Sequence, residues 1–286
     1  EKMKCVLTAM TSTFMNRTNH RLSPVSSMLV EEVLALIETC RKEFLPSPQH
    51  PQYVFGYNDA ARILYGVFRI SSRSLKYSGP PQKSRLFIHE MQRVLEDRML
   101  LKNDIQKLRN IIHQTVMNTF GKALEVGEDD SLTSQYWPQS FHMAVEFDRK
   151  PCLFTDLIGK DGYIEMTQLT KIQESIKDAC ERWNKTAEKL SQPRLNIIPF
   201  KFTVSHLLRA TRTLSGTRDH LLLTGQPSTG KHTVLMMAAE LLHFSYVDMD
   251  IAQLLSQNGG WRTALKKTLV SAAKGERILL VISLNC

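Results

Sequence analysis

One feature constrains the fold of this chain more than any other, the run Gly225-Gln226-Pro227-Ser228-Thr229-Gly230-Lys231. Its spacing is G-x-x-x-x-G-K, in which glycines let backbone N–H groups approach phosphate oxygens and the lysine reaches the β- and γ-phosphates. Three leucines ending at Leu223 precede the run, and residues 233–242 follow it with a Met-, Ala- and Leu-rich helical composition. We therefore expect a buried parallel strand, a phosphate loop and a helix, with an ordinary Gly-rich turn as the alternative.

The residue after the lysine departs from the motif. Ser or Thr is expected there, because its hydroxyl ligates Mg²⁺, but the chain has His232, with Thr233 one residue late. A neutral imidazole is a poor ligand for a hard, oxygen-seeking cation. We expect ATP or ADP to bind at residues 225–233, with Thr233 as the metal candidate and little Mg²⁺-assisted hydrolysis.

The acidic residues near the loop give no catalytic assignment. The strand pattern at residues 277–284 contains no Asp or Glu, although this class of protein carries one at its tip to orient Mg²⁺ and water. Asp248 and Asp250 belong to the preceding strand pattern, and we interpret them as polar caps of a strand end. Residues 125–130 hold four carboxylates among glycine and serine, and we interpret them as a solvated loop in preference to a metal site.

Composition places the chain among globular proteins and narrows its partners. Its 286 residues, 42% hydrophobic and 23% charged, suffice for two domains. The net charge of +9 comes from scattered basic residues without interleaved aromatics, so we expect no nucleic-acid partner. The longest apolar run, residues 278–282, is too short for a bilayer, and we expect no membrane partner. The five cysteines have no C-x-x-C spacing and are interpreted as buried thiols of a reducing compartment.

Hydrophobic periodicity predicts a mainly helical N-terminal half. A helix should start at Pro24 and end before Pro46, and Asn58 or Asp59 should be the N-cap of the next helix. The heptad-like stretch from Phe87 to Ile112 could form a coiled coil, but a capping box at Asn103 favours two separate helices. Further on, the patterns predict helices at 169–183, 199–214 and 261–272 and strands at 244–250 and 277–284.

These segments together resemble a known family. The order CLFTDLI, NIIPFKFTVSHLLRATRTLSG, HLLLTGQPSTGKHTVLMMAAELLHF, WRTALKKTL and ERILLVIS is similar to the fourth AAA+ module of a dynein heavy chain. The earlier FLPSPQHPQYVFGYNDAARILYGVF and LFIHEMQRVLEDRM are similar to the helical subdomain that closes the third module. The resemblance implies an α/β fold with a mainly α N-terminal half. Residues 1–150 would form an AAA+ helical subdomain, and residues 151–286 would begin a P-loop parallel sheet that is truncated before its end.

The resemblance also implies a function. The parent would be a ring ATPase that moves along microtubules, with other AAA+ modules and dynein intermediate and light chains as partners, in the cytoplasm and cytoskeleton or in a ciliary or flagellar axoneme. In such a module this site would be regulatory, and the adenine of the nucleotide would lie at residues 197–200. A residue without a hydroxyl after the phosphate-loop lysine is common in the family, so His232 fits a family variant. The alternative is a decayed nucleotide site in a ciliary or flagellar scaffold. A free-standing P-loop kinase is disfavoured, because nothing in the sequence supplies a site for a phosphate acceptor.

One departure from the family pattern concerns the third module. Dyneins usually have N-L-R-D where this chain has Gly56-Tyr57-Asn58-Asp59, although Arg62 is kept. The missing arginine would face the nucleotide of the third module, so sensing at that site is in doubt. The chain therefore resembles the atypical members called dynein heavy chain domain-containing proteins.

Overall fold

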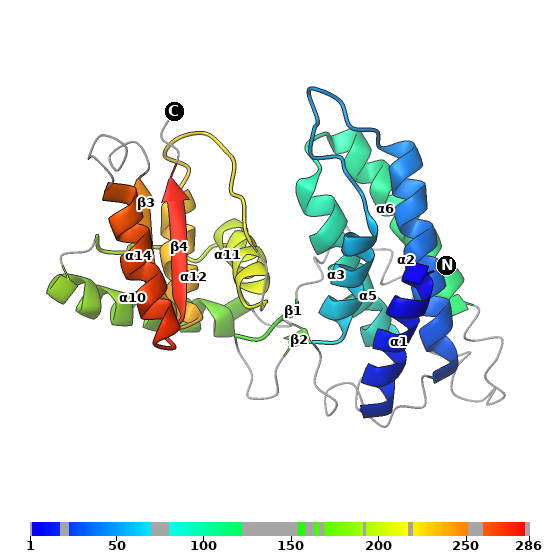
Figure 1. Cartoon of the computed structure of the whole chain (residues 1–286), viewed down its shortest axis with the longest axis horizontal. Coiled ribbons are helices and arrows are strands. Elements are labelled where there is room, and N and C mark those ends of the chain that lie inside the picture. Colours follow the sequence, from blue (N-terminus) through cyan, green and yellow to red (C-terminus); the bar gives the residue numbers. More distant parts are fainter. Residues whose placement is uncertain are drawn as a thin grey trace. The chain divides into compact units, whose positions relative to one another are not determined.

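The computed structural model describes residues 2–17, 23–69, 80–121, 154–157, 163–165, 169–190, 193–216, 220–250 and 260–283. The chain forms two compact units, Glu1–Met166 and Thr167–Cys286 (Figure 1). The boundary at residue 150 stays a prediction, and the acidic stretch 125–130 lies outside the described residues.

The first unit is a bundle of helices. Its elements are α1 (Lys2–Arg17), α2 (Ser23–Glu43), α3 (Tyr57–Val67), α5 (Pro80–Leu95), the short η1 (Glu96–Arg98), α6 (Lys102–Val116) and η2 (Met117–Gly121). Helix α2 packs against α1, α3 and α6, while α5 packs against α3 and α6. The apolar face of α2 is buried where its side chains are described, because Val33, Ile37 and Cys40 each have no exposed surface.

The stretch with heptad-like spacing is two helices, as predicted. Helix α5 ends at Leu95, and α6 starts at Lys102 with Leu101 as its N-cap, so the capping residue is not Asn103. Arg98 lies between them, where its guanidinium donates to Asp59 Oδ1 over 2.7 Å and lies 5.3 Å from the ring centre of Phe55. The heptad spacing puts Arg98 where a coiled coil would need an apolar residue. Its pairing with Asp59 and its contact with Phe55 explain why an arginine is found there.

The N-terminus of α3 also differs from its expected form. Gly56 is the N-cap, and Asp59 is the third helical residue, whose Oδ2 accepts from the backbone N–H of Gly56 over 3.0 Å. This is the reciprocal half of a capping box, supplied from inside the helix. The expectation that Asn58 or Asp59 would itself be the N-cap was wrong.

A short antiparallel pair belongs to the first unit and was not expected from the sequence. Strand β1 (Phe154–Thr155) pairs with β2 (Ile164–Glu165). Phe154 and Tyr163 are buried against Leu86 of α5. The Tyr163 hydroxyl donates to Glu90 Oε1 over 2.6 Å and lies 3.0 Å from His89 Nε2, so a buried polar cluster joins this pair to α5.

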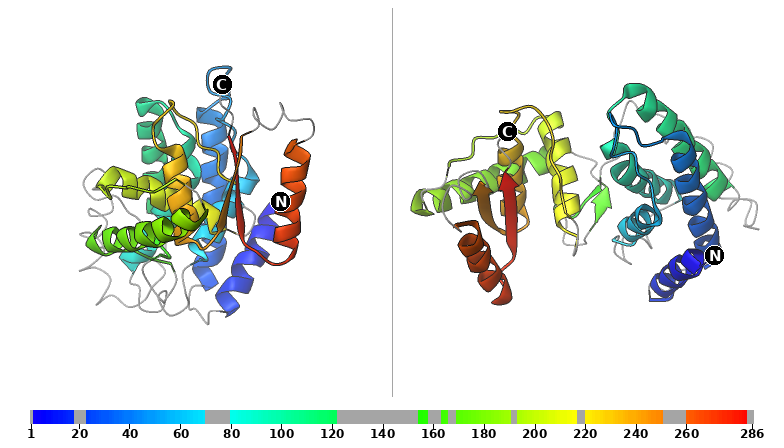
Figure 2. Two further views of the ribbon diagram at one scale, coloured as in Figure 1. Left: turned by 90° about the vertical axis from the view of Figure 1, so that its left-hand side faces the viewer. Right: turned by 45° about the horizontal axis from the view of Figure 1, so that its top comes forward.

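The second unit has the α/β character that the sequence predicts. It contains α10 (Leu169–Leu190), α11 (Lys201–Leu214), α12 (Lys231–Leu241), β3 (Ser245–Asp250), α14 (Gly260–Ala273) and β4 (Ile278–Ser283). Strands β3 and β4 are parallel, with Asp248 opposite Val281 and Asp250 opposite Ser283. Helices α12 and α14 lie on opposite faces of this strand pair (Figure 2). Because parallel strands need a crossover connection, α14 between them fits this topology.

One expected element is missing from the described part of the second unit. Residues 220–226, which include the three leucines, have no strand assignment, and Leu222 is 85% exposed. The prediction of a buried strand was therefore wrong for these residues. A β-strand is stabilised by hydrogen bonds to a neighbour, and the β3–β4 sheet does not include this segment.

The fold class is confirmed, since a helical unit precedes a unit with a small parallel sheet. The cysteine prediction was partly wrong: Cys40 is buried, Cys180 is half-buried, but Cys5 is exposed. Cys152 and Cys286 lie outside the described residues. Among the residues that can be described, no helix has the length and apolarity needed to span a bilayer.

Candidate functional site

The phosphate-loop residues form an open turn at the start of α12. Gly230 is the N-cap of this helix and has a left-handed backbone with φ of 81°, and Gly225 has φ of 156°. Residues with a Cβ atom are strained at these backbone φ angles, whereas glycine is not. Ser228 also has a positive φ, 62°. The two glycines of the motif therefore stand where the backbone requires glycine.

The turn leads into a helix N-terminus that favours anions. The first helical bond runs from the N–H of Val234 to the carbonyl of Gly230 over 3.0 Å. The preceding amides, those of Lys231, His232 and Thr233, thus have no acceptor within the helix. Such amides and the positive end of the helix dipole attract negative charge. Buried Met236, Met237, Ala238 and Ala239 hold the helix in the unit.

The Lys231 ammonium lies within the turn and does not point away from it. Its Nζ donates to the carbonyls of Gly225 over 3.0 Å and Gln226 over 2.6 Å, and lies 3.4 Å from Thr229 Oγ1. Thr229 in turn donates to the Gln226 carbonyl over 2.9 Å. An incoming phosphate must exchange with these carbonyl contacts to reach the ammonium. The structure thus brings Gly225, Gln226, Thr229 and Lys231 together, while Pro227 and Ser228 form the tip of the turn.

His232 lies in a polar cluster built from three elements. Its Nδ1 is 3.3 Å from the Tyr246 hydroxyl and 3.3 Å from Asp248 Oδ2, both on β3. Its Nε2 is 3.5 Å from Ser283 Oγ on β4, and Ser283 donates to Asp248 Oδ1 over 2.8 Å. We call His232, Tyr246, Asp248 and Ser283 the His232 cluster. His232 is the residue directly after the lysine of the loop, so it joins this cluster to the start of α12.

The contacts of Asp248 with His232 and Ser283 were not predicted from the sequence. Asp248 lies on the strand before the one that should carry an acidic residue, so the sequence indicated only a polar cap. The parallel register places Asp248 and Ser283 near the carboxyl ends of neighbouring strands, which is the edge where α/β sheets bind ligands. The alternation of the SYVDMD segment was the available signal, but a single strand pattern does not reveal its register with the next strand.

Tyr246 takes part in the cluster as a neutral hydroxyl. Burial raises the pKa of the Tyr246 phenol, and the negative charge of Asp248 and a hydrogen bond to it raise that pKa further. The Trp183 ring packs edge-on against Tyr246 with ring centres 6.0 Å apart. The phenol therefore stays protonated at neutral pH.

The segment expected to lie against adenine is apolar and exposed. Ile198 is 76% exposed and Phe200 is 54% exposed. Phe200 stacks on Phe202 with an angle of 10° between the rings, and Gln173 Nε2 donates to the Pro199 carbonyl over 2.7 Å. This segment immediately precedes α11, which packs against α12.

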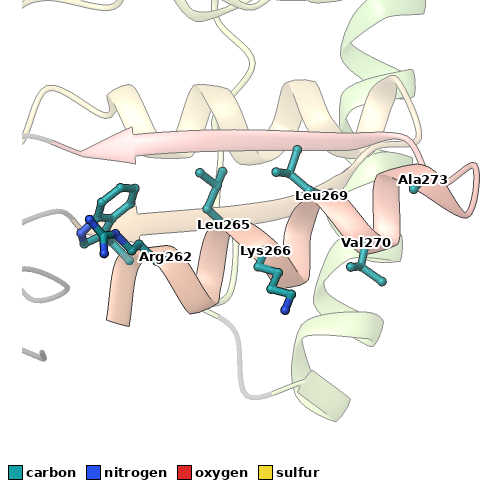
Figure 3. A pocket seen from close by; sticks show the side chains of 7 residues that line it. Arg262, Leu265, Lys266, Leu269, Val270 and Ala273 are labelled. Atoms are coloured by element: carbon teal, nitrogen blue, oxygen red, sulfur yellow. The ribbon is translucent and has the colours of Figure 1, made fainter. Parts of the chain in front are cut away.

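A separate groove runs along α14. Its volume is about 330 Å³, and it is lined by Trp261, Arg262, Leu265, Lys266, Leu269, Val270 and Ala273. All of these side chains come from one helix (Figure 3). The loop residues 225–231 do not line this groove.

Metal ligands do not gather in the part of the chain that the structure describes. No group of three His, Cys, Asp or Glu residues there could hold a metal ion. The sequence prediction that Thr233 could ligate a metal stays a prediction. Thr233 is the residue after His232 in α12, and successive residues of a helix point about 100° apart.

Comparison with known proteins supports the same order of domains. Residues 29–130 match the family model described as AAA+ lid domain. Residues 195–284 match the model described as P-loop containing dynein motor region D4. The first match lies in the helical unit, and the second contains the loop and the His232 cluster.

Similar curated proteins are dynein heavy chains. The chain is 26% identical over 253 residues to dynein axonemal heavy chain 3 of Homo sapiens, covering 85% of this chain and 6% of that protein. It is 26% identical over 236 residues to dynein axonemal heavy chain 17 of Mus musculus, covering 82% and 5%. For dynein axonemal heavy chain 12 of Rattus norvegicus the values are 22% over 262 residues, 88% and 8%. The chain thus spans less than a tenth of the length of these relatives, and its resemblance to the dynein heavy chains is confirmed.

Proposed function

We propose that this chain, with the AAA+ lid and P-loop motor region of the dynein heavy chain family, binds ATP or ADP at residues 225–233. One observation carries the proposal: a left-handed Gly230 turns the chain into α12 while the Lys231 ammonium stays inside the turn. The free amides at the start of α12 would accept the phosphate oxygens, and Lys231 would neutralise their charge. The nucleotide phosphates would replace the carbonyls of Gly225 and Gln226 as partners of Lys231.

The base of the nucleotide would lie against residues 197–200. Support comes from the exposed apolar side chains of Ile198 and Phe200, which offer contact area to an aromatic ring. The segment leads into α11, the helix packed on the phosphate-binding helix α12. This placement would let one nucleotide contact both segments of the second unit.

Hydrolysis at this site would be slow, and its role regulatory. Strand β4 carries no carboxylate between Ile278 and Ser283, so it offers no acid to orient water. Asp248 on β3 is the nearby carboxylate, but it is already engaged by Ser283 and His232. A site that binds nucleotide without efficient turnover can report nucleotide state to neighbouring modules through binding energy alone.

For the parent protein we propose microtubule-based movement as a multi-module AAA+ ring. Support comes from relatives that are named axonemal dynein heavy chains and from the match to dynein motor region D4. The parent would then lie in the cytoskeleton of cilia or flagella. Its partners would be the other AAA+ modules of the same chain, microtubules, and dynein intermediate and light chains.

Binding of a fluorescent ADP or ATP analogue to the parent protein, with and without Lys231→Ala, tests the nucleotide site. Removal of the ammonium should weaken the component assigned to this loop at least about tenfold, equivalent to about 1.4 kcal/mol. Lys267→Ala is the matched control, since Lys267 is an exposed residue of α14 and loses the same charge. Equal binding by the wild type, Lys231→Ala and Lys267→Ala would overturn the proposal.

A structural scaffold with a decayed site is the second candidate. It is favoured by the contacts of Lys231 with the carbonyls of its own loop, which satisfy the ammonium without phosphate. The same binding experiment separates the two functions, because a scaffold would show no Lys231-dependent binding.

A further inference from the structure

The family resemblance implies Mg²⁺ beside the phosphates, and the residues of this site can be tested against that ion. Mg²⁺ requires near-octahedral oxygen ligands at about 2.0–2.1 Å and is usually held by one or two carboxylates or hydroxyls together with substrate phosphates. In the P-loop motif the hydroxyl comes from the residue after the lysine. In this chain that residue is His232, whose ring nitrogens are softer ligands than oxygen.

The adjacent Thr233 does not replace the missing hydroxyl. Both residues lie in the first turn of α12, which begins at Lys231. A shift of one residue rotates a side chain by about 100° around the helix axis. The imidazole therefore takes the direction in which position 232 points, and a side chain at position 233 projects about 100° away from that direction.

The carboxylate beside this position is already engaged by protein groups. Asp248 Oδ1 accepts from Ser283 Oγ over 2.8 Å, and Oδ2 lies 3.3 Å from His232 Nδ1. The Tyr246 hydroxyl lies 3.3 Å from the same ring nitrogen. A metal ion that used Asp248 as a ligand would have to break these contacts. The donor set of the His232 cluster therefore does not fit Mg²⁺.

We infer that nucleotide binding at residues 225–231 does not depend on Mg²⁺, because the His232 cluster occupies the position of the metal ligands. This inference rests on the proposed function and adds a property of the same site. The phosphates would be held by the loop amides, the start of α12 and Lys231 alone. Imidazole at position 232 would fill the space beside the phosphates with a hydrogen-bonded protein group.

The test measures binding of a fluorescent ADP analogue to the parent protein in excess EDTA and in excess MgCl₂. Subtracting the signal of Lys231→Ala in each buffer isolates this site from other nucleotide sites. We expect the Lys231-dependent dissociation constant to differ by less than about threefold between the buffers, well below the tenfold change that 1.4 kcal/mol produces. Lys231-dependent binding that requires MgCl₂ overturns the inference and leaves the proposed function standing.

A second variant tests the assigned cause. His232→Ser places a hydroxyl at the motif position and releases Asp248 from the imidazole, so MgCl₂ should then tighten binding by about tenfold or more. His220→Ser is the matched control, since His220 is exposed and precedes the loop, and it should behave like the wild type. Insensitivity of His232→Ser to MgCl₂ would contradict the role given to position 232. Absence of Lys231-dependent binding in both buffers overturns the proposed function and this inference with it.

Discussion

Arg98 Nη2 donates to Asp59 Oδ1 over 2.7 Å, joining the segment between α5 and α6 to the first turn of α3. Asp59 is 7% exposed at its side chain and also accepts from the backbone N–H of Gly56. One carboxylate thus caps the start of α3 and pairs with a guanidinium that lies 39 residues after Asp59 in the sequence.

Asp59→Ala should therefore destabilise the helical unit. The substitution leaves the partly buried Arg98 without a carboxylate and removes the reciprocal cap, at a cost of about 3–5 kcal/mol. Urea unfolding followed by circular dichroism measures the change. Glu43→Ala, at the exposed end of α2, should leave the unfolding free energy within about 0.5 kcal/mol of the wild type. Equal stability of both variants would show that the pair contributes nothing.

Gly66→Ala should destabilise the same unit through a steric effect. A Cβ atom at Gly66 would be 1.7 Å from Glu90 Oε2, and Glu90 is fully buried. The clash should cost about 2–3 kcal/mol after relaxation, more than the gain of up to about 1 kcal/mol in helix propensity. Gly56→Ala is the control, because no atom lies within 4 Å of its added Cβ. A Gly66→Ala variant that melts at or above the wild-type temperature would disprove this close approach.

Tyr163→Phe tests the cluster that joins β1 and β2 to α5. Loss of the hydroxyl removes a hydrogen-bond donor from Glu90 and a partner from His89, both buried. The expected loss of stability is about 1–3 kcal/mol. Tyr57→Phe makes the same change where an exposed hydroxyl donates to Glu38, and should cost less than about 0.5 kcal/mol. A ranking of the two variants in the opposite order would refute the importance of the buried cluster.

The Cys40 thiol should make stability fall at high pH. Burial raises its pKa from 9.0 to about 12, while the positive charge of Arg98 lowers this pKa and the negative charge of Asp59 raises it by smaller amounts. The unfolded thiol ionises first, so this contribution to stability is fully present below pH 9 and is lost as pH rises toward 12. Unfolding of Cys40→Ala should lose less stability over this range, by up to about 1.4 kcal/mol per pH unit. Exposed Cys5 provides the control, since the unfolding free energy of Cys5→Ala should vary with pH as that of the wild type does. The same pH dependence in Cys40→Ala and the wild type would contradict the prediction.

Periodicity predicted the helices well because their apolar stripes are local properties of the sequence. The pattern from Ser23 predicted α2, and the interpretation of residues 87–112 as two helices in place of one coiled coil was correct. The N-cap of α6 is Leu101 and not Asn103. The N-cap of α3 was assigned incorrectly because Asp59 acts from inside the helix and contacts Arg98, which is distant in sequence. Residue type alone did not reveal that contact.

The candidate site could be predicted only in part. The motif located the loop and α12, but a strand depends on its neighbours, and Leu221 to Leu223 lack a strand assignment. The association of Asp248 with His232 and Ser283 depends on the parallel register of β3 and β4. No periodicity within one strand contains that information, so Asp248 was interpreted as a polar cap.

Hydrogen–deuterium exchange of the parent protein, with and without ADP, tests the nucleotide-binding claim most directly because it reports the backbone amides at this loop. We predict that ADP slows exchange in peptides covering residues 225–234 of the wild type and has no such effect in Lys231→Ala. Unchanged exchange of these wild-type peptides at saturating ADP would contradict the claim that the turn before α12 holds phosphate.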